Sequence, residues 1–143
     1  MHLASRRCWT WLFAGSLLLA AGCQRDPFHY DQVSGTIRYA DGQPIPFHRL
    51  VVTLVPQAEA IDAKTHPRPA QALVQADGTF DVVTTINYGD GAIRGRHKVT
   101  IVALDANEMP SNVIPPQYAS EQTTPLEFDT SQSPWAIAID RPE

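Results

Sequence analysis

The sequence has few cysteines and no excess of positive charge. Only two of its 143 residues are cysteines, so a disulfide framework is excluded and the fold must depend on its hydrophobic core. The formal net charge is −4 at pH 7, whereas nucleic-acid binding calls for a clustered basic face. Internal repeats and low-complexity tracts are also missing, which excludes repeat architectures. We therefore expect one ordinary globular domain that does not bind nucleic acid.

The chain also has no apolar run of the roughly 20 residues that a membrane-spanning helix needs. Its longest run, residues 9–19, follows Arg6 and Arg7 and is followed by the small residues Ala20-Ala21-Gly22. A positive start, a short apolar run and small residues occur in this order in export signals. This order predicts that residues 1–22 are a signal peptide and that the rest of the chain is exported.

The residue after these small residues is Cys23, and Ala20-Ala21-Gly22-Cys23 resembles the lipobox of bacterial lipoproteins. The resemblance implies that the Cys23 thiol is acylated, that Cys23 becomes the mature N-terminus, and that the attached lipid holds the protein on a membrane. The alternative is a soluble secreted protein cut at an Ala-x-Ala-like site, with Cys23 as an unused thiol.

The residue after Cys23 is Gln24 rather than Asp, which resembles outer-membrane sorting. We therefore expect the outer rather than the inner membrane, with the domain on its periplasmic or extracellular side. Residues 23–30 are predicted to be the lipidated N-terminus and a short tether. The seven residues after Cys23 span at most about 25 Å, so the domain is expected to stay near the membrane.

Beyond residue 30 the chain has the pattern of strands. Apolar and polar residues alternate, turn signals such as Asp41-Gly42 separate the segments, and the 12 prolines lie at or near predicted strand boundaries. Ala76-Asp77-Gly78 predicts a hairpin turn. The predicted strands are residues 33–39, 50–55, 70–75, 79–84, 95–104, 126–128 and 135–139. The predicted core includes Ile37, Val52, Leu54, Phe80, Val99, Ile101, Phe128 and Ile137. Because a one-faced sheet needs a second sheet to cover it, we expect an all-β, seven-stranded Greek-key β-sandwich over residues 31–140.

Several short motifs follow one another in a characteristic order. They are Val33-x-Gly35-x-Ile37, Asp41-Gly42-x-Pro44, Val52-x-Leu54-x-Pro56, Asp77-Gly78-x-Phe80 and Gly95-x-His97-x-Val99-x-Ile101. Together they resemble the carboxypeptidase regulatory-like domain, which has a transthyretin-like fold. Residues 114–118, Ile-Pro-Pro-Gln-Tyr, resemble small bacterial lipoproteins built from that one domain. The resemblance implies an accessory module without zinc ligands, so we expect a non-catalytic, lipid-anchored cell-envelope module with a structural or protein-interaction role and no cofactor.

Two other functions stay open. A carbohydrate- or peptide-binding surface lipoprotein would use loops 56–69 and 105–122, and an exposed aromatic cluster around Tyr88 and Tyr118 would favour it. Its partner would be an envelope glycan or protein. A transthyretin-related hydrolase is the least favoured, because hydroxyisourate hydrolases end in Tyr-Arg-Gly-Ser and this chain ends in Arg-Pro-Glu. We therefore predict no catalytic residues.

The remaining polar candidates have ordinary explanations. No two of the four histidines beyond residue 23 have the spacing of metal ligands, so no metal site is predicted; they are His29, His48, His66 and His97. His97 is expected to be packed or at the rim, and Trp135 to lie in the core rather than to stack on sugars. Residues 94–98 form a basic cluster that faces either anionic groups or, as we favour, solvent and neighbouring acids. Asp90-Gly91 indicates a turn rather than a calcium site.

Overall fold

The structure, a computed structural model, describes residues 26–143, so the predicted signal peptide and Cys23 lie outside the described residues. The described part is all-β, with short 3₁₀ helices and no α-helix. Its strands are β1 (Tyr30–Asp31), β2 (Gly35–Tyr39), β3 (Arg49–Pro56), β4 (Ala70–Leu73), β5 (Thr79–Phe80), β6 (Val83–Thr84), β7 (Ala92–Ile93), β8 (Arg96–Leu104), β9 (Glu127–Asp129) and β10 (Trp135–Ile139), and its 3₁₀ helices are η1 (Pro116–Ala119) and η2 (Thr130–Gln132). No helix within residues 26–143 is long and apolar enough to cross a membrane.

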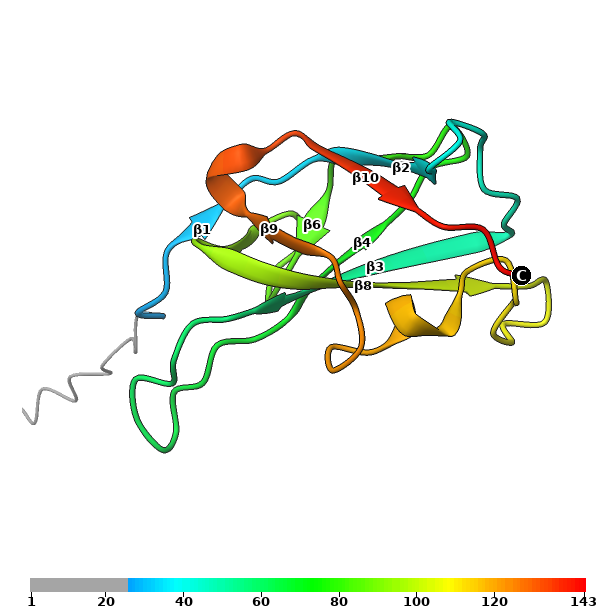
Figure 1. The fold of residues 1–143 in the computed structure, drawn as a ribbon. Coiled ribbons are helices and arrows are strands. Elements are labelled where there is room, and N and C mark those ends of the chain that lie inside the picture. Colours follow the sequence, from blue (N-terminus) through cyan, green and yellow to red (C-terminus); the bar gives the residue numbers. More distant parts are fainter. Residues whose placement is uncertain (1–25) are drawn as a thin grey trace, which may run out of the picture.

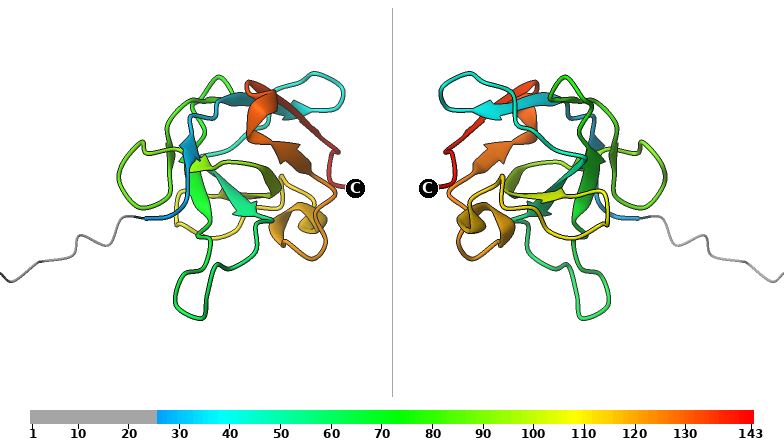
Figure 2. Two further views of the ribbon diagram at one scale, coloured as in Figure 1. Left: turned by 90° about the vertical axis from the view of Figure 1, so that its left-hand side faces the viewer. Right: turned by 90° about the vertical axis from the view of Figure 1, so that its right-hand side faces the viewer.

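The strands form two main sheets that face each other (Figure 1). The larger sheet is antiparallel, with the order β6-β4-β3-β8-β9. The smaller sheet has the order β10-β2-β5, and β10 runs parallel to β2. A short antiparallel ladder joins β1 to β7 and ties the start of the described chain to the domain. The views along the length of the domain show the two layers and the long β3–β4 loop that projects from them (Figure 2).

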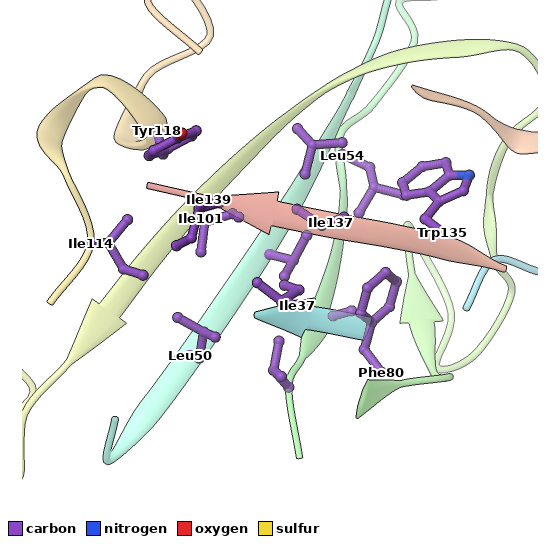
Figure 3. Packing of buried hydrophobic residues seen from close by; sticks show 14 of the residues in the cluster. Ile37, Leu50, Leu54, Phe80, Ile101, Ile114, Tyr118, Trp135, Ile137 and Ile139 are labelled. Carbon is purple, nitrogen blue, oxygen red and sulfur yellow. The ribbon is translucent and has the colours of Figure 1, made fainter. Parts of the chain in front are cut away.

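The hydrophobic core lies between the two sheets (Figure 3). Alternate residues of the long strands β3 and β8 are fully buried, as the period-2 pattern predicts, and the inner side chains of β2 and β10 cover them. All the predicted core residues are buried except Phe128, which is only half-buried. Phe128 lies on β9, at the border of its sheet, and its ring stacks on Trp135 with 5.1 Å between centroids. Trp135 is itself buried, as expected.

The predicted strand over residues 79–84 is divided between the two sheets. The turn before it forms as predicted, with Gly78 N–H donating to Gln75 O at 2.8 Å. After that turn β5 pairs with β2, and β6 pairs with β4 in the other sheet. The physical reason is that Phe80 and Val83 are both buried although they are three residues apart. One straight strand would direct them to opposite faces, so the chain bends between them and buries one in each sheet.

The connection between β8 and β9 is anchored to the domain although it has little regular structure. The Tyr39 hydroxyl donates to Val113 O at 2.8 Å, and the Thr124 hydroxyl donates to Val99 O at 2.7 Å. Ile114 and Tyr118 are buried against the core. This connection therefore covers the core beyond the strands, and it shapes the surface at the C-terminal end of the domain.

Candidate functional site

A large hollow on the described surface lies against this connection. It has a volume of about 960 Å³ and is bordered by residues 110–119, the second half of β8 and the C-terminal residues 140–143. Pockets that bind small ligands commonly have volumes of roughly 300–1,000 Å³. We refer to this hollow as the C-terminal groove. It belongs to loop 105–122, one of the two loops in which the sequence places a possible binding surface.

One wall of the C-terminal groove is held in place by Tyr118. Pro115 and Pro116 begin the η1 turn, where a fixed φ and a missing N–H suit the start of a helix. The turn buries the ring of Tyr118, whose hydroxyl donates to Asp140 Oδ2 at 2.9 Å and accepts from the Asp140 N–H at 3.2 Å. The residues that follow β10 are therefore fixed to the η1 turn.

The opposite wall is held by Arg141. Its guanidinium lies over the Tyr39 ring, 4.3 Å from the centroid, and its Nε donates to Asp41 Oδ2 at 2.7 Å. This hydrogen bond, with help from the Gln43 N–H, lowers the pKa of the Asp41 carboxyl. The pair is exposed, so we assign it little stability; its effect is to orient the last residues of the chain.

The lining of the C-terminal groove mixes apolar, amide and charged side chains, the last being Asp140, Arg141 and Glu143. Prolines 110, 115 and 116 lie beside Asn112 and Gln117, and the residues that line the groove include no histidine, cysteine or lysine. Such a surface offers apolar contact and amide hydrogen bonds, which suit an extended chain. It presents no pairing of a nucleophile with a nitrogen base.

A second, smaller hollow of about 470 Å³ lies over β3, β4 and β6. Three apolar side chains around it are exposed, namely Leu73, Val82 and Tyr88, and Tyr88 is 88% exposed. Tyr118, by contrast, is 3% exposed. The exposed aromatic cluster of Tyr88 and Tyr118 that would favour sugar binding is therefore not formed.

The basic cluster of residues 94–98 is offset by neighbouring acids, as we favoured. Arg94 Nη2 lies 2.9 Å from Asp31 Oδ1, and Arg96 pairs with Glu127. The hydrogen bonds from Arg94 and Thr130 lower the pKa of Asp31. The Lys98 ammonium donates to Glu121 O at 3.1 Å. These cations therefore do not form a free positive patch.

His97 is the one histidine of the predicted set that the fold buries. It is 1% exposed, its Nδ1 lies 3.0 Å from Gly95 O, and its Nε2 has no partner within the described residues. Burial lowers the pKa of the imidazole. The other three histidines, His29, His48 and His66, are exposed. Residues 26–143 contain no cluster of three side chains suited to a metal ion.

Asp90 forms a turn, as its sequence context indicates. Its carboxylate accepts from the N–H groups of Thr85, Ile86 and Asn87 at 2.7–2.9 Å. Burial raises the pKa of Asp90, but the backbone donors outweigh it and the net shift is downward. The carboxylate is thus occupied by its own loop.

The polar contacts that shape the C-terminal groove were not predicted from the sequence. Arg141 and its partners Tyr39 and Asp41 are about 100 residues apart in the chain and carry no local motif. The sequence named loop 105–122 only as one of two possible binding loops. The predicted lipid site, Cys23, lies outside the described residues. The chain gives no significant match to any protein-family model, curated protein or solved structure.

Proposed function

We propose that this chain is a non-catalytic, lipid-anchored module of the bacterial cell envelope, with a structural or protein-interaction role. The observation that carries the proposal is the lipobox-like Ala20-Ala21-Gly22-Cys23, which lies seven residues before the first strand at Tyr30. An export signal, a lipid and a small all-β domain then follow one another with little chain between them.

The short distance between lipid and domain is supported by contacts near the start of the described chain. Asp26 accepts hydrogen bonds from the Phe28 N–H and from the Tyr30 hydroxyl. Burial and this hydrogen bond raise the pKa of Tyr30. Only three peptide steps separate Cys23 from Asp26, which is about 11 Å at most. A lipid on Cys23 would therefore hold the domain close to the membrane surface.

We further propose that the fold is a transthyretin-like Greek-key sandwich of the carboxypeptidase regulatory-like kind. Two facing sheets with a shared core support this, as does the order of motifs along the chain. In such a module function depends on what the surface contacts, because the fold itself does not specify an activity.

A second candidate is a peptide-binding surface lipoprotein. The C-terminal groove favours it, because amides and prolines line a hollow of suitable volume in loop 105–122. Because Tyr118 is buried and cannot stack on a sugar, carbohydrate binding is less favoured than peptide binding. Saturable binding of peptides from an extended-peptide library, lost on changing Gln117 and Asn112 to Ala, would favour peptide binding over a purely structural role.

The lipid anchor is tested by changing Cys23→Ser in a bacterial host that processes lipoproteins. The wild-type chain should incorporate radiolabelled palmitate and sediment with membranes, whereas the variant should be unlabelled and absent from the membrane fraction. Cys8→Ser is the matched control and should behave as wild type. Membrane retention of the Cys23→Ser chain would contradict the proposal.

The non-catalytic assignment is tested by metal analysis of the purified chain. We expect well below one equivalent of zinc or copper, since His29, His48 and His66 are exposed and His97 is enclosed in the core. Near one equivalent of either metal, lost on changing His48 or His97 to Ala, would overturn it.

A further inference from the structure

Strand β10 is the border of the smaller sheet, where it pairs only with β2 (Figure 1). Its residues alternate between buried and exposed: Trp135, Ile137 and Ile139 face the core, and Ala136 and Ala138 are exposed. The strand contains no proline and no charged residue, the devices that usually protect a border strand from pairing.

The hydrogen-bonding groups of the two alanines point away from the domain. Trp135 N–H donates to Ser34 O, and Ile139 O accepts from Ala40 N–H, both at 2.8 Å, so the odd-numbered residues of β10 bond to β2. In a parallel ladder the residues between them direct their N–H and C=O to the other side. Ala136 and Ala138 thus present two donors and two acceptors that have no partner within the described residues.

The other border strands of the two main sheets are partly capped by their own chain. On β5, Thr79 O accepts from Gln75 N–H and Thr79 N–H donates to Asp77. On β9, Asp129 N–H donates to the Gln132 side chain and Asp129 O accepts from the Trp135 indole.

On β6, the Gly91 N–H donates to Val83 O at 2.9 Å, so this border too has an acceptor occupied by its own chain. Each of these three borders therefore has backbone groups occupied by its own chain, whereas neither Ala136 nor Ala138 of β10 has such a contact within residues 26–143.

We propose that the free edge of β10 binds the same edge of a second copy of this chain, antiparallel and centred on Ile137. Ala136 of one copy would lie opposite Ala138 of the other, and each such pair exchanges two backbone hydrogen bonds. The two three-stranded sheets would then join into one continuous sheet.

The free backbone N–H and C=O groups of Ala136 and Ala138 lie symmetrically on either side of Ile137, and the next outward-facing residue at each end offers no free N–H. This symmetry favours pairing with a second copy over pairing with an unrelated strand. At one end Pro134 has no N–H to offer, and at the other the Asp140 N–H is already donated to Tyr118 Oη at 3.2 Å. In the paired register Asp140 lies opposite Pro134 of the other copy, so no like charges face each other. Ala136 and Ala138 are exposed, and their side chains are small and uncharged.

A cross-linking experiment tests the register. Full-length chains carrying Ala136→Cys and Ala138→Cys are purified in detergent, mixed and oxidised, and the linked peptides are identified by mass spectrometry. In the paired register, the Cα atoms of residue 136 in one copy and residue 138 in the other lie about 5.5 Å apart, which is within disulfide range. The Cα atoms of residue 136 in the two copies, or of residue 138 in the two copies, lie roughly 9 Å apart, which is outside that range. We expect a 136–138 link in the mixture at least tenfold above the 136–136 or 138–138 link. Absence of the 136–138 link, or equal amounts of all three, would overturn the proposal.

A charge variant tests the interface itself. Changing Ala136→Lys together with Ala138→Lys places two pairs of like charges across the interface, and should convert a concentration-dependent dimer into a monomer in analytical ultracentrifugation. Ala40→Lys with Gln71→Lys, two exposed positions off β10, is the matched control and should leave the dimer unchanged. The pairing would be refuted if the wild-type chain stayed monomeric at all concentrations. It would also be refuted if the β10 double variant and the control double variant dimerised equally. If the β10 variant fails to fold by circular dichroism, the cross-link alone decides.

Discussion

At the scale of single residues, the burial of His97 makes the stability of the folded domain depend on pH. Its imidazole is buried with one nitrogen unpartnered, and burial lowers its pKa, with only Asp129 and Gly95 O opposing that shift. The unfolded chain therefore binds the His97 proton at a higher pH than the folded chain does. Stability from this group is complete above the unfolded pKa of about 6.5 and is lost as the pH falls below it.

Below pH 6.5, we expect the free energy of unfolding of the wild-type chain to fall by up to about 1.4 kcal/mol per pH unit relative to that of His97→Gln. The glutamine side chain of this variant keeps a donor for Gly95 O. Urea unfolding at pH 7.5, 6, 5 and 4.5 measures this difference. His66→Gln, at an exposed histidine, should follow wild type. Parallel pH profiles of wild type and His97→Gln would show that the buried imidazole is not responsible.

Gly35 is required because of what lies beside it. A Cβ there would come within 2.6 Å of Trp135 O and 2.8 Å of the Phe80 ring, so β2 can approach β10 and β5 only without a side chain. Gly35→Ala should cost roughly 1–3 kcal/mol by overpacking. Gly42→Ala, where φ is +82° and nothing lies within 4 Å, should cost only the roughly 1 kcal/mol of a left-handed backbone. Chemical denaturation of both variants makes the comparison, and a Gly35→Ala chain as stable as wild type would contradict the packing.

At the scale of elements, β3 and β8 are the centre of the larger sheet. Leu54 and Ile101 are fully buried, one on each strand. Truncating either to Ala should lower the free energy of unfolding by about 2–5 kcal/mol, through lost burial and the cavity that remains. Leu73→Ala on β4, whose side chain is largely exposed, should change stability by less than about 0.5 kcal/mol. Thermal and urea denaturation provide the measurement, and similar losses for all three would argue against this core.

The C-terminal groove depends on single contacts between elements. Tyr118 joins η1 to the end of β10 through Asp140, and Arg141 joins the last residues to the end of β2. These residues act as positioning groups, because they determine where residues 110–119 and 140–143 lie relative to each other. A partner that used the groove would therefore meet a surface shaped before binding.

At the scale of the whole molecule, the fold of residues 26–143 has no disulfide to add to its core. The only cysteines are Cys8 and Cys23, so residues 26–143 contain none and no disulfide can link their strands. We expect the thermal midpoint to be the same with and without dithiothreitol, and the far-ultraviolet circular dichroism spectrum to be that of a β protein. A midpoint that falls on reduction, or a spectrum dominated by helix, would contradict this description.

The strands and their buried faces were predictable because alternation is a local property. Residues 50–55 are a nearly continuous apolar run, which predicts a central strand, and residues 95–104 place Val99, Ile101 and Ala103 on one face; all three of these and Leu54 are buried. The turn at Asp77-Gly78 was predictable for the same reason: it depends on neighbours in the chain.

Only the tertiary structure decided which strands become partners. The parallel pairing of β10 with β2 joins residues about 100 positions apart and has no local signal. The division of residues 79–84 between two sheets depends on burying both Phe80 and Val83 in one shared core. The C-terminal groove, the burial of His97 and the free edge of β10 likewise arise from residues far apart in the chain. The alternation of apolar residues specifies which face of a strand is buried, but the free energy that selects its neighbour comes from contacts that exist only once the sheets have packed.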